Sequence, residues 1–143
     1  MVLELAEDRR IRVGAFGTHR FPAGVYAYVG SALSGIEQRV ARHVRNVKKN
    51  RWHVDYLLGK GTVQSIIAIP SMDKGTECAV ARALLASAGA KIVVKGFGSS
   101  DCRCESHLVY FGAEDPAWVS ESVAKMIAML SCVYPSRTDA RRE

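Results

Sequence analysis

Long hydrophobic runs are missing from this sequence. The longest apolar stretches, such as residues 66–70, fall far short of the roughly 18–20 residues that a membrane-spanning helix needs. The chain does not open with a basic segment followed by a long apolar one, which is the pattern of an export signal. No repeat with a period of roughly 20–50 residues is present, which excludes repeat architectures. We therefore expect a cytoplasmic protein without a membrane partner, and nothing in the sequence indicates its oligomeric state.

The composition is that of a folded domain. The chain has 143 residues, of which 48% are hydrophobic and 24% charged, and this excludes wholesale disorder. The length suits one compact domain, which we expect over residues 1–134, with a polar, disordered tail over residues 135–143. A core of this size and the lack of an export signal indicate reduced thiols at the four cysteines, which are Cys78, Cys102, Cys104 and Cys132.

Acidic residues are missing from one stretch of the chain, between Gln38 and Val54. That stretch contains six basic residues: Arg39, Arg42, Arg45, Lys48, Lys49 and Arg51. The formal net charge is +6, so the remaining 14 basic residues balance the 14 acidic ones and the whole excess lies in this window. Clustering of this kind favours a polyanionic partner, and nucleic acid is the usual one. The alternative is a solvated basic helix face without a ligand.

The hydrophobic pattern predicts strands that alternate with helices, which is typical of an α/β fold with a mixed sheet. Strands are expected at residues 2–5, 11–16, 25–29, 62–69, 91–94 and 108–111. Helices are expected to begin near residue 36, with an apolar stripe at Ile36, Val40, Val44 and Val47, and at residues 52–58, 77–87 and 116–132. The first two strands are expected to form a hairpin, and residues 96–106 a loop.

An aromatic strand leads into the basic helix. Tyr26 and Tyr28 are two residues apart and therefore share one face of the strand. Arg39 and His43 are four apart, which places them on neighbouring turns of one helix face. A guanidinium matches the oxygens of a phosphate, and an imidazole can move a proton near neutral pH. The alternative is that the tyrosines are core residues and that Arg39 and His43 merely belong to a basic helix.

Two carboxylates stand near expected helix starts. Glu77 begins a helix of otherwise small, apolar residues, and the helix dipole alone can explain an acid there. The functional alternative is a hard ligand for a divalent ion such as Mg²⁺, which takes one or two protein carboxylates and keeps open positions for phosphate. Asp55, with His53, begins the helix after the basic run, where capping and a functional role are equally compatible with the sequence.

Together these residues resemble the GIY-YIG nuclease superfamily. The resemblance rests on Tyr28-Val29-Gly30-Ser31-Ala32, on Arg39 and His43, and on Glu77 at a later helix start. Residues 52–58 and 96–108 are in addition similar to an uncharacterised prokaryotic branch of that superfamily. The resemblance implies a small, mixed, largely antiparallel central sheet flanked by helices. It also implies an endonuclease that hydrolyses phosphodiester bonds with the help of a metal, with DNA favoured over RNA as the substrate.

The resemblance also implies roles for single residues. Glu77 would bind one divalent ion, Mg²⁺ or Mn²⁺, and Arg39 would stabilise charge on the scissile phosphate. Tyr28 would position or deprotonate the attacking water, and His43 would assist proton transfer or grip the phosphate. The other basic residues would lead the nucleic-acid backbone to this site; they are Arg42, Arg45, Lys48, Lys49 and Arg51.

The first half-motif of the superfamily, Gly-X-Tyr, does not stand on the expected first strand. Gly24-Val25-Tyr26 has the same letters, but it lies on the strand of Tyr28 instead of a neighbouring one. This departure motivates the alternative function, a catalytically silent module that binds nucleic acid with the same basic helix.

The expected loop before the last strand is a second candidate site. Its chemistry-bearing residues are Ser100, Asp101, Cys102, Cys104 and His107. Cys-X-Cys-X₂-His offers three ligands for zinc, and Cys78 a fourth, but zinc sites usually separate paired cysteines by about two to four residues. We therefore expect no structural zinc and a site loop held by local hydrogen bonds. A zinc-stabilised interaction domain is a third alternative for the function.

Overall fold

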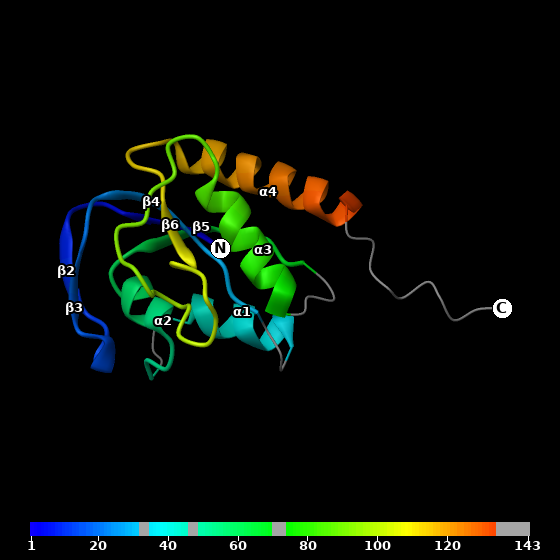
Figure 1. The fold of residues 1–143 in the computed structure, drawn as a ribbon. Coiled ribbons are helices and arrows are strands. Elements are labelled where there is room, and N and C mark those ends of the chain that lie inside the picture. Colours follow the sequence, from blue (N-terminus) through cyan, green and yellow to red (C-terminus); the bar gives the residue numbers. More distant parts are fainter. Residues whose placement is uncertain (32–34, 46–48, 70–73, 134–143) are drawn as a thin grey trace.

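The computed structural model describes residues 1–31, 35–45, 49–69 and 74–133. Over these residues the chain forms a mixed α/β fold in which helices flank a four-stranded antiparallel sheet (Figure 1). This confirms the fold class that the sequence predicts. The expected tail lies wholly outside the described residues, so the division at residue 134 stays a prediction.

The sheet has the strand order β5-β1-β4-β6, formed by Thr62–Ser65, Val2–Leu5, Gly24–Tyr28 and Leu108–Tyr110. Alternate side chains of a strand point to opposite faces, so Tyr26 and Tyr28 share a face with Leu3, as predicted. Val25 and the alternate residues that follow it, Ala27 and Val29, pack on the other face. Both faces are covered, which explains why β1 and β4 are almost entirely apolar.

Different elements cover the two faces. Helices α3 (Lys74–Leu85) and α4 (Pro116–Val133) pack on one of them, with Val80 and Val123 in its core. The other face is covered by α2 (His53–Leu58), by the residues around Phe97, and by a separate hairpin of β2 (Arg9–Arg12) and β3 (Thr18–Phe21). Helix α1 (Ile36–Val44) lies beside α2 at the lower side of Figure 1, away from α4.

The expected hairpin is wrong in its pairing. β1 pairs with β4 and β5, whereas β2 pairs with β3 in the register Ile11↔His19. The short helix Gly14–Phe16 joins β2 to β3. Within β2 only Ile11 is buried, and its arginine neighbours are exposed. Because these arginines are charged, the hydrophobic pattern of the sequence does not predict a strand over residues 9–12.

Three smaller predictions also change. The expected strand over residues 62–69 ends at Ser65, and residues 91–94 contribute one bridge, Lys91↔Tyr110. In α1 the expected apolar stripe is broken, because Val44 is 58% exposed. Val47 and Lys48 lie outside the described residues. Helix α2 ends at Leu58, before Gly59, as predicted, and begins at His53, one residue after the expected start.

No helix in the described ranges is both long and apolar enough to cross a bilayer.

Candidate functional site

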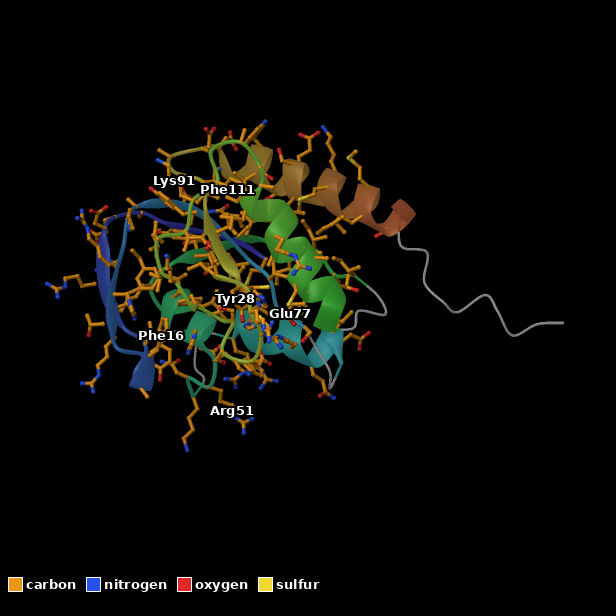
Figure 2. The ribbon with its side chains drawn as sticks, in the orientation of Figure 1. Phe16, Tyr28, Arg51, Glu77, Lys91 and Phe111 are labelled. Atoms are coloured by element: carbon orange, nitrogen blue, oxygen red, sulfur yellow. The ribbon has the colours of Figure 1, made fainter. Side chains whose placement is uncertain are left out.

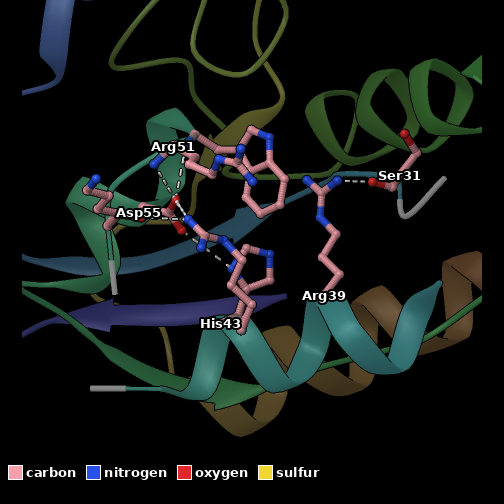
Figure 3. A network of polar contacts seen from close by, with 8 residues as sticks. Ser31, Arg39, His43, Arg51 and Asp55 are labelled. Atoms are coloured by element: carbon pink, nitrogen blue, oxygen red, sulfur yellow. Dashed lines mark hydrogen bonds and ion pairs between the residues drawn. The ribbon is translucent and has the colours of Figure 1, made fainter. Parts of the chain in front are cut away.

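The end of β4 and the first turns of α1 bring Tyr28 and Arg39 together. The Arg39 guanidinium donates from Nη1 to the carbonyl oxygen of Ser31 and lies 4.5 Å from the centroid of the Trp52 ring (Figure 3). Between the two residues stands Gly30. A Cβ atom at Gly30 would lie 2.6 Å from Arg39 Nη2 and 3.0 Å from Tyr28 Cε1. The glycine of the motif therefore leaves the space in which the arginine approaches the tyrosine.

A pocket of about 310 Å³ opens beside these residues. Its polar end is lined by Tyr28, Gly30, Ser31, Arg39 and His43, and the rest by apolar side chains of α1, α3, α4 and residues 66–69. Three of the four residues that the resemblance assigns to catalysis thus line one pocket. The fourth, Glu77, is not among the residues that line this pocket.

Tyr28 is a neutral hydroxyl at physiological pH. Burial raises the pKa of Tyr28 to about 12, although the Arg39 guanidinium partly offsets this and the Glu77 carboxylate adds to it. A phenol with so high a pKa does not accept a proton from water as a base. It can position a ligand by hydrogen bonding, which is one of the two roles that the resemblance implies.

Asp55 fixes the junction between α1 and α2. Its fully buried carboxylate accepts hydrogen bonds from the backbone N–H groups of Arg51 and Trp52 and from Arg42 Nη2, at 2.9, 3.0 and 2.8 Å (Figure 3). Burial acts to raise the pKa of Asp55, but these hydrogen bonds outweigh it and lower the pKa. The carboxylate also lies 3.9 Å from Nδ1 of the buried His43. Asp55 therefore caps α2, and its carboxylate lies within ion-pair distance of His43.

His53, two residues before Asp55, is also a structural residue. Its Nδ1 accepts a hydrogen bond from the Gly98 N–H at 3.0 Å, and its ring stacks on Phe16 with centroids 4.5 Å apart. His53 thereby links α2 to the turn of the β2–β3 hairpin.

The basic residues separate into two groups. Arg42 is held by Asp55, by the carbonyl oxygen of Lys49 and by the Trp52 ring, with 22% of its side chain exposed. Arg45, Lys49 and Arg51 are exposed. Lys48 lies outside the described residues. The surface available to a polyanion is therefore formed by the exposed members, and Arg42 joins α1 to α2.

Glu77 points into the protein. Its Oε1 lies 2.8 Å from Nδ1 of the fully buried His107, and Ser31 hydrogen-bonds the carboxylate through its hydroxyl and its backbone N–H. Burial acts to raise the pKa of Glu77, but the hydrogen bonds from His107 and Ser31 outweigh it and lower the pKa. Figure 2 shows Glu77 at the lower end of α3, near Tyr28. The carboxylate is engaged on both sides by protein groups.

Three thiols surround the other nitrogen of His107. Nε2 lies 3.4 Å from Cys102 Sγ and 4.0 Å from Cys78 Sγ, and with Cys104 Sγ these ligand atoms all lie within 4.8 Å of one another. Cys78 comes from the first turns of α3, and the other three residues come from the loop before β6. The described part of the chain thus contains a Cys₃His cluster.

The expectation of Mg²⁺ or Mn²⁺ at Glu77, with no structural zinc, is wrong. The donor set that the fold brings together is three thiols and one imidazole, and such soft donors select zinc or another thiolate-binding ion. Magnesium and manganese prefer carboxylate, carbonyl and water oxygens. The one-residue gap between Cys102 and Cys104 was a misleading objection, because Cys78 completes the cluster from a distant element.

Backbone hydrogen bonds within the loop accompany the cluster. The Cys102 N–H donates to the Ser99 carbonyl at 3.3 Å, and the His107 N–H donates to the Phe97 carbonyl at 2.8 Å. Ser100 and Asp101 are exposed positions of this loop outside the Cys₃His cluster.

The sequence-based hypothesis gave no role to two residues of the site, although both lie in the stretches that carry the resemblance. Trp52 stacks under Arg39, and Ser31 bonds both Arg39 and Glu77. Trp52 has one local signal, its place at the start of a helix next to a basic run. Nothing local marks Ser31 as a link between β4 and α3.

These features define a small mixed α/β domain with a candidate thiolate metal centre behind a guanidinium pocket. By sequence the chain belongs to the family described as "Domain of unknown function DUF123", whose model matches residues 1–130. No curated protein and no solved structure matches the chain.

Proposed function

We propose that this domain binds the phosphodiester backbone of nucleic acid, DNA before RNA, and that it is a divergent member of the GIY-YIG superfamily. The observation that carries the proposal is the placement of Tyr28, Arg39 and His43 around one pocket. Charged, aromatic and imidazole groups that converge in this way suit a phosphate and its neighbouring sugar or base.

Arg39 is the central contact in this proposal. A guanidinium has five N–H donors in a fixed fork, and the Ser31 carbonyl and the Trp52 ring orient that fork at the polar end of the pocket. A phosphate there would accept bidentate, charge-assisted hydrogen bonds. The exposed Arg45, Lys49 and Arg51 follow in the chain and extend the positive surface along which a backbone could lie.

A second candidate function is hydrolysis of that backbone. It is favoured by the position of the Tyr28 hydroxyl beside Arg39 and by the contact of His43 with Asp55. Arg39 would stabilise charge on the phosphoryl oxygens, Tyr28 would position the attacking water, and His43 would transfer a proton. Binding without hydrolysis needs only the first of these groups.

Fluorescence anisotropy with labelled duplex and branched DNA tests the binding proposal. We expect Arg39→Ala to weaken binding by about tenfold or more, and Arg39→Lys to restore only part of it because an ammonium cannot bind bidentately. Lys125→Gln on α4 is the matched control, since Lys125 pairs with Glu121 on a distant surface. Equal affinities of wild type and Arg39→Ala would overturn the proposal.

The second candidate, hydrolysis, is tested by cleavage of plasmid and branched DNA. The protein used has a metal ion bound at its Cys₃His cluster. Tyr28→Phe removes only a hydroxyl, so we expect it to keep DNA affinity and to lower the cleavage rate by about 10²-fold, typical of one positioned catalytic group. If the wild type binds DNA and leaves it intact, hydrolysis is excluded and the binding function stands alone.

A further inference from the structure

We propose that Cys78, Cys102, Cys104 and His107 bind one zinc ion, and that this ion fixes the position of Arg39 through Glu77 and Ser31. The first half is independent of the function proposed above. Only the consequence for DNA affinity rests on that function.

The four donor atoms fit one tetrahedral ion. Zinc lies about 2.3 Å from a thiolate sulfur and about 2.0–2.1 Å from an imidazole nitrogen, so neighbouring ligand atoms stand roughly 3.6–3.8 Å apart. The distances from His107 Nε2 to Cys102 Sγ and Cys78 Sγ, 3.4 and 4.0 Å, lie on either side of that spacing. Four protein ligands complete the coordination, which is typical of a structural site.

Glu77 selects the form of His107 that can bind zinc. Because Nδ1 faces the Glu77 carboxylate at 2.8 Å, the proton of the neutral ring belongs on Nδ1 and the lone pair of Nε2 points at the three sulfurs. A carboxylate behind a ligating histidine is the usual arrangement in zinc sites, where it fixes the ring and its tautomer. His107 is fully buried, so water does not compete for either nitrogen.

The same carboxylate connects the cluster to the pocket. Ser31 hydrogen-bonds Glu77 through its hydroxyl and its N–H, and the Ser31 carbonyl accepts the hydrogen bond from Arg39. A second link runs through the backbone, where the Val29 N–H donates to the His107 carbonyl at 3.0 Å. An ion that joins α3 to the loop would therefore also hold Val29 and Ser31 at the end of β4, and the Ser31 carbonyl anchors Arg39.

Metal analysis and cobalt substitution test the zinc site. We expect one zinc ion per chain in the purified protein, and a tetrahedral cobalt–thiolate absorption after exchange. Cys104→Ser should lose the ion, while Cys132→Ser is the matched control because Cys132 is not among the four ligands. Protein without bound zinc, or Cys104→Ser with full occupancy, would overturn the site whatever the protein does to DNA.

Variants of Glu77 test whether its carboxylate positions His107 or only fills space. Glu77→Ala is expected to lower zinc affinity by about 10–100-fold, the usual effect of removing a carboxylate behind a ligand. Glu77→Gln should recover most of this, because its amide oxygen can still accept the Nδ1 proton. Equal zinc affinity of wild type and both variants would exclude the positioning role of Glu77.

The emission of Trp52 reports the link to Arg39 without any DNA. The chain has two tryptophans, and Trp118→Phe leaves Trp52 alone as the probe beneath Arg39. In that background, Glu77→Ala at saturating zinc should shift the emission toward that of Arg39→Ala, with circular dichroism confirming that both remain folded. Unchanged emission would overturn the link while leaving the zinc site intact.

DNA affinity completes the test. If zinc binds and Trp52 responds, Glu77→Ala at saturating zinc should bind DNA more weakly than Glu77→Gln. If the wild type does not bind DNA at all, the function proposed above fails and the zinc site with its link remains.

Discussion

Glu77 and His107 meet through a 2.8 Å contact between a carboxylate oxygen and Nδ1, in the interior of the domain. This contact changes the chemistry expected of Glu77. A carboxylate that receives the imidazole on one side and Ser31 on the other cannot also serve as the principal ligand of a hard cation. It is arranged instead to hold the histidine of a thiolate cluster.

Removal of the Asp55 carboxylate should strongly destabilise the domain. Asp55→Ala leaves two capped N–H groups and the partly buried Arg42 without their acceptor, and breaking such a buried pair typically costs about 3–5 kcal/mol. The free energy of unfolding in urea measures the effect. Glu121→Ala, which breaks an exposed pair with Lys125, should cost no more than about 0.5 kcal/mol. Similar losses in both variants would contradict the buried role of Asp55.

The stability of the domain should depend on pH through the Asp55 carboxylate. The pKa of Asp55 is lower in the folded protein than in the unfolded chain, so its contribution is complete above the unfolded pKa of about 3.9. The contribution is lost as the pH falls through the folded pKa. We expect the free energy of unfolding of the wild type to fall more steeply below pH 4 than that of Asp55→Asn. Parallel curves for the two proteins would refute this.

A methyl group at Gly30 should affect the pocket more than the fold. The new Cβ would lie 2.6 Å from Arg39 Nη2, the far end of a long side chain, and 3.0 Å from Tyr28 Cε1. Arg39 would therefore move away, and the Tyr28 ring would shift by only a few tenths of an ångström. We expect Gly30→Ala to keep its melting temperature within a few degrees and to bind DNA about tenfold more weakly, the loss of roughly one hydrogen bond to a charged group. Gly59→Ala is the matched control, because its Cβ meets its nearest neighbour at 3.6 Å. Normal DNA affinity in Gly30→Ala would speak against Arg39 as the central contact.

Salt titration should separate the exposed cations from Arg42. Each phosphate contact contributes a slope of about −0.9 to the plot of log affinity against log salt, so Arg51→Gln and Lys49→Gln should each make the slope shallower by up to about 1. Neither should change stability by more than about 0.5 kcal/mol, since both side chains are exposed. Arg42→Gln should instead lower the free energy of unfolding, because Arg42 holds Asp55. Slopes identical to that of the wild type would remove Lys49 and Arg51 from the interface.

The sequence predicted those features that depend on neighbouring residues. The alternation of Tyr26 and Tyr28, and the limits of α2 at Trp52 and Gly59, follow from local rules for strands and helix caps. The partners of β2 and β1 did not follow, because strand pairing joins segments distant in the sequence and the arginines of β2 hide its one buried residue, Ile11. Val44 looked like a core residue by its spacing, but nothing covers it among the described residues.

The candidate site was also predicted only in part. The resemblance pointed to Tyr28, Arg39 and His43, and the fold does bring them to one pocket. The four residues of the cluster were named from the sequence, but a zinc site was not expected because of the one-residue gap between Cys102 and Cys104. The packing of α3 against the loop before β6 brings Cys78 to them. Spacing rules describe ligands that stand on one turn, and a cluster shared between two elements does not obey them.

The first strand of the chain occupies the middle of the sheet. β1 pairs with β4 on one side and with β5 on the other, in contacts as distant as Val2↔Ser65. During synthesis one edge of β1 therefore stays open until β5 has emerged, and an open edge invites pairing with other chains. Conditions that slow elongation between β4 and β5 should consequently raise aggregation of the nascent chain. The long-range pairing also indicates slower folding than in helical domains of this size.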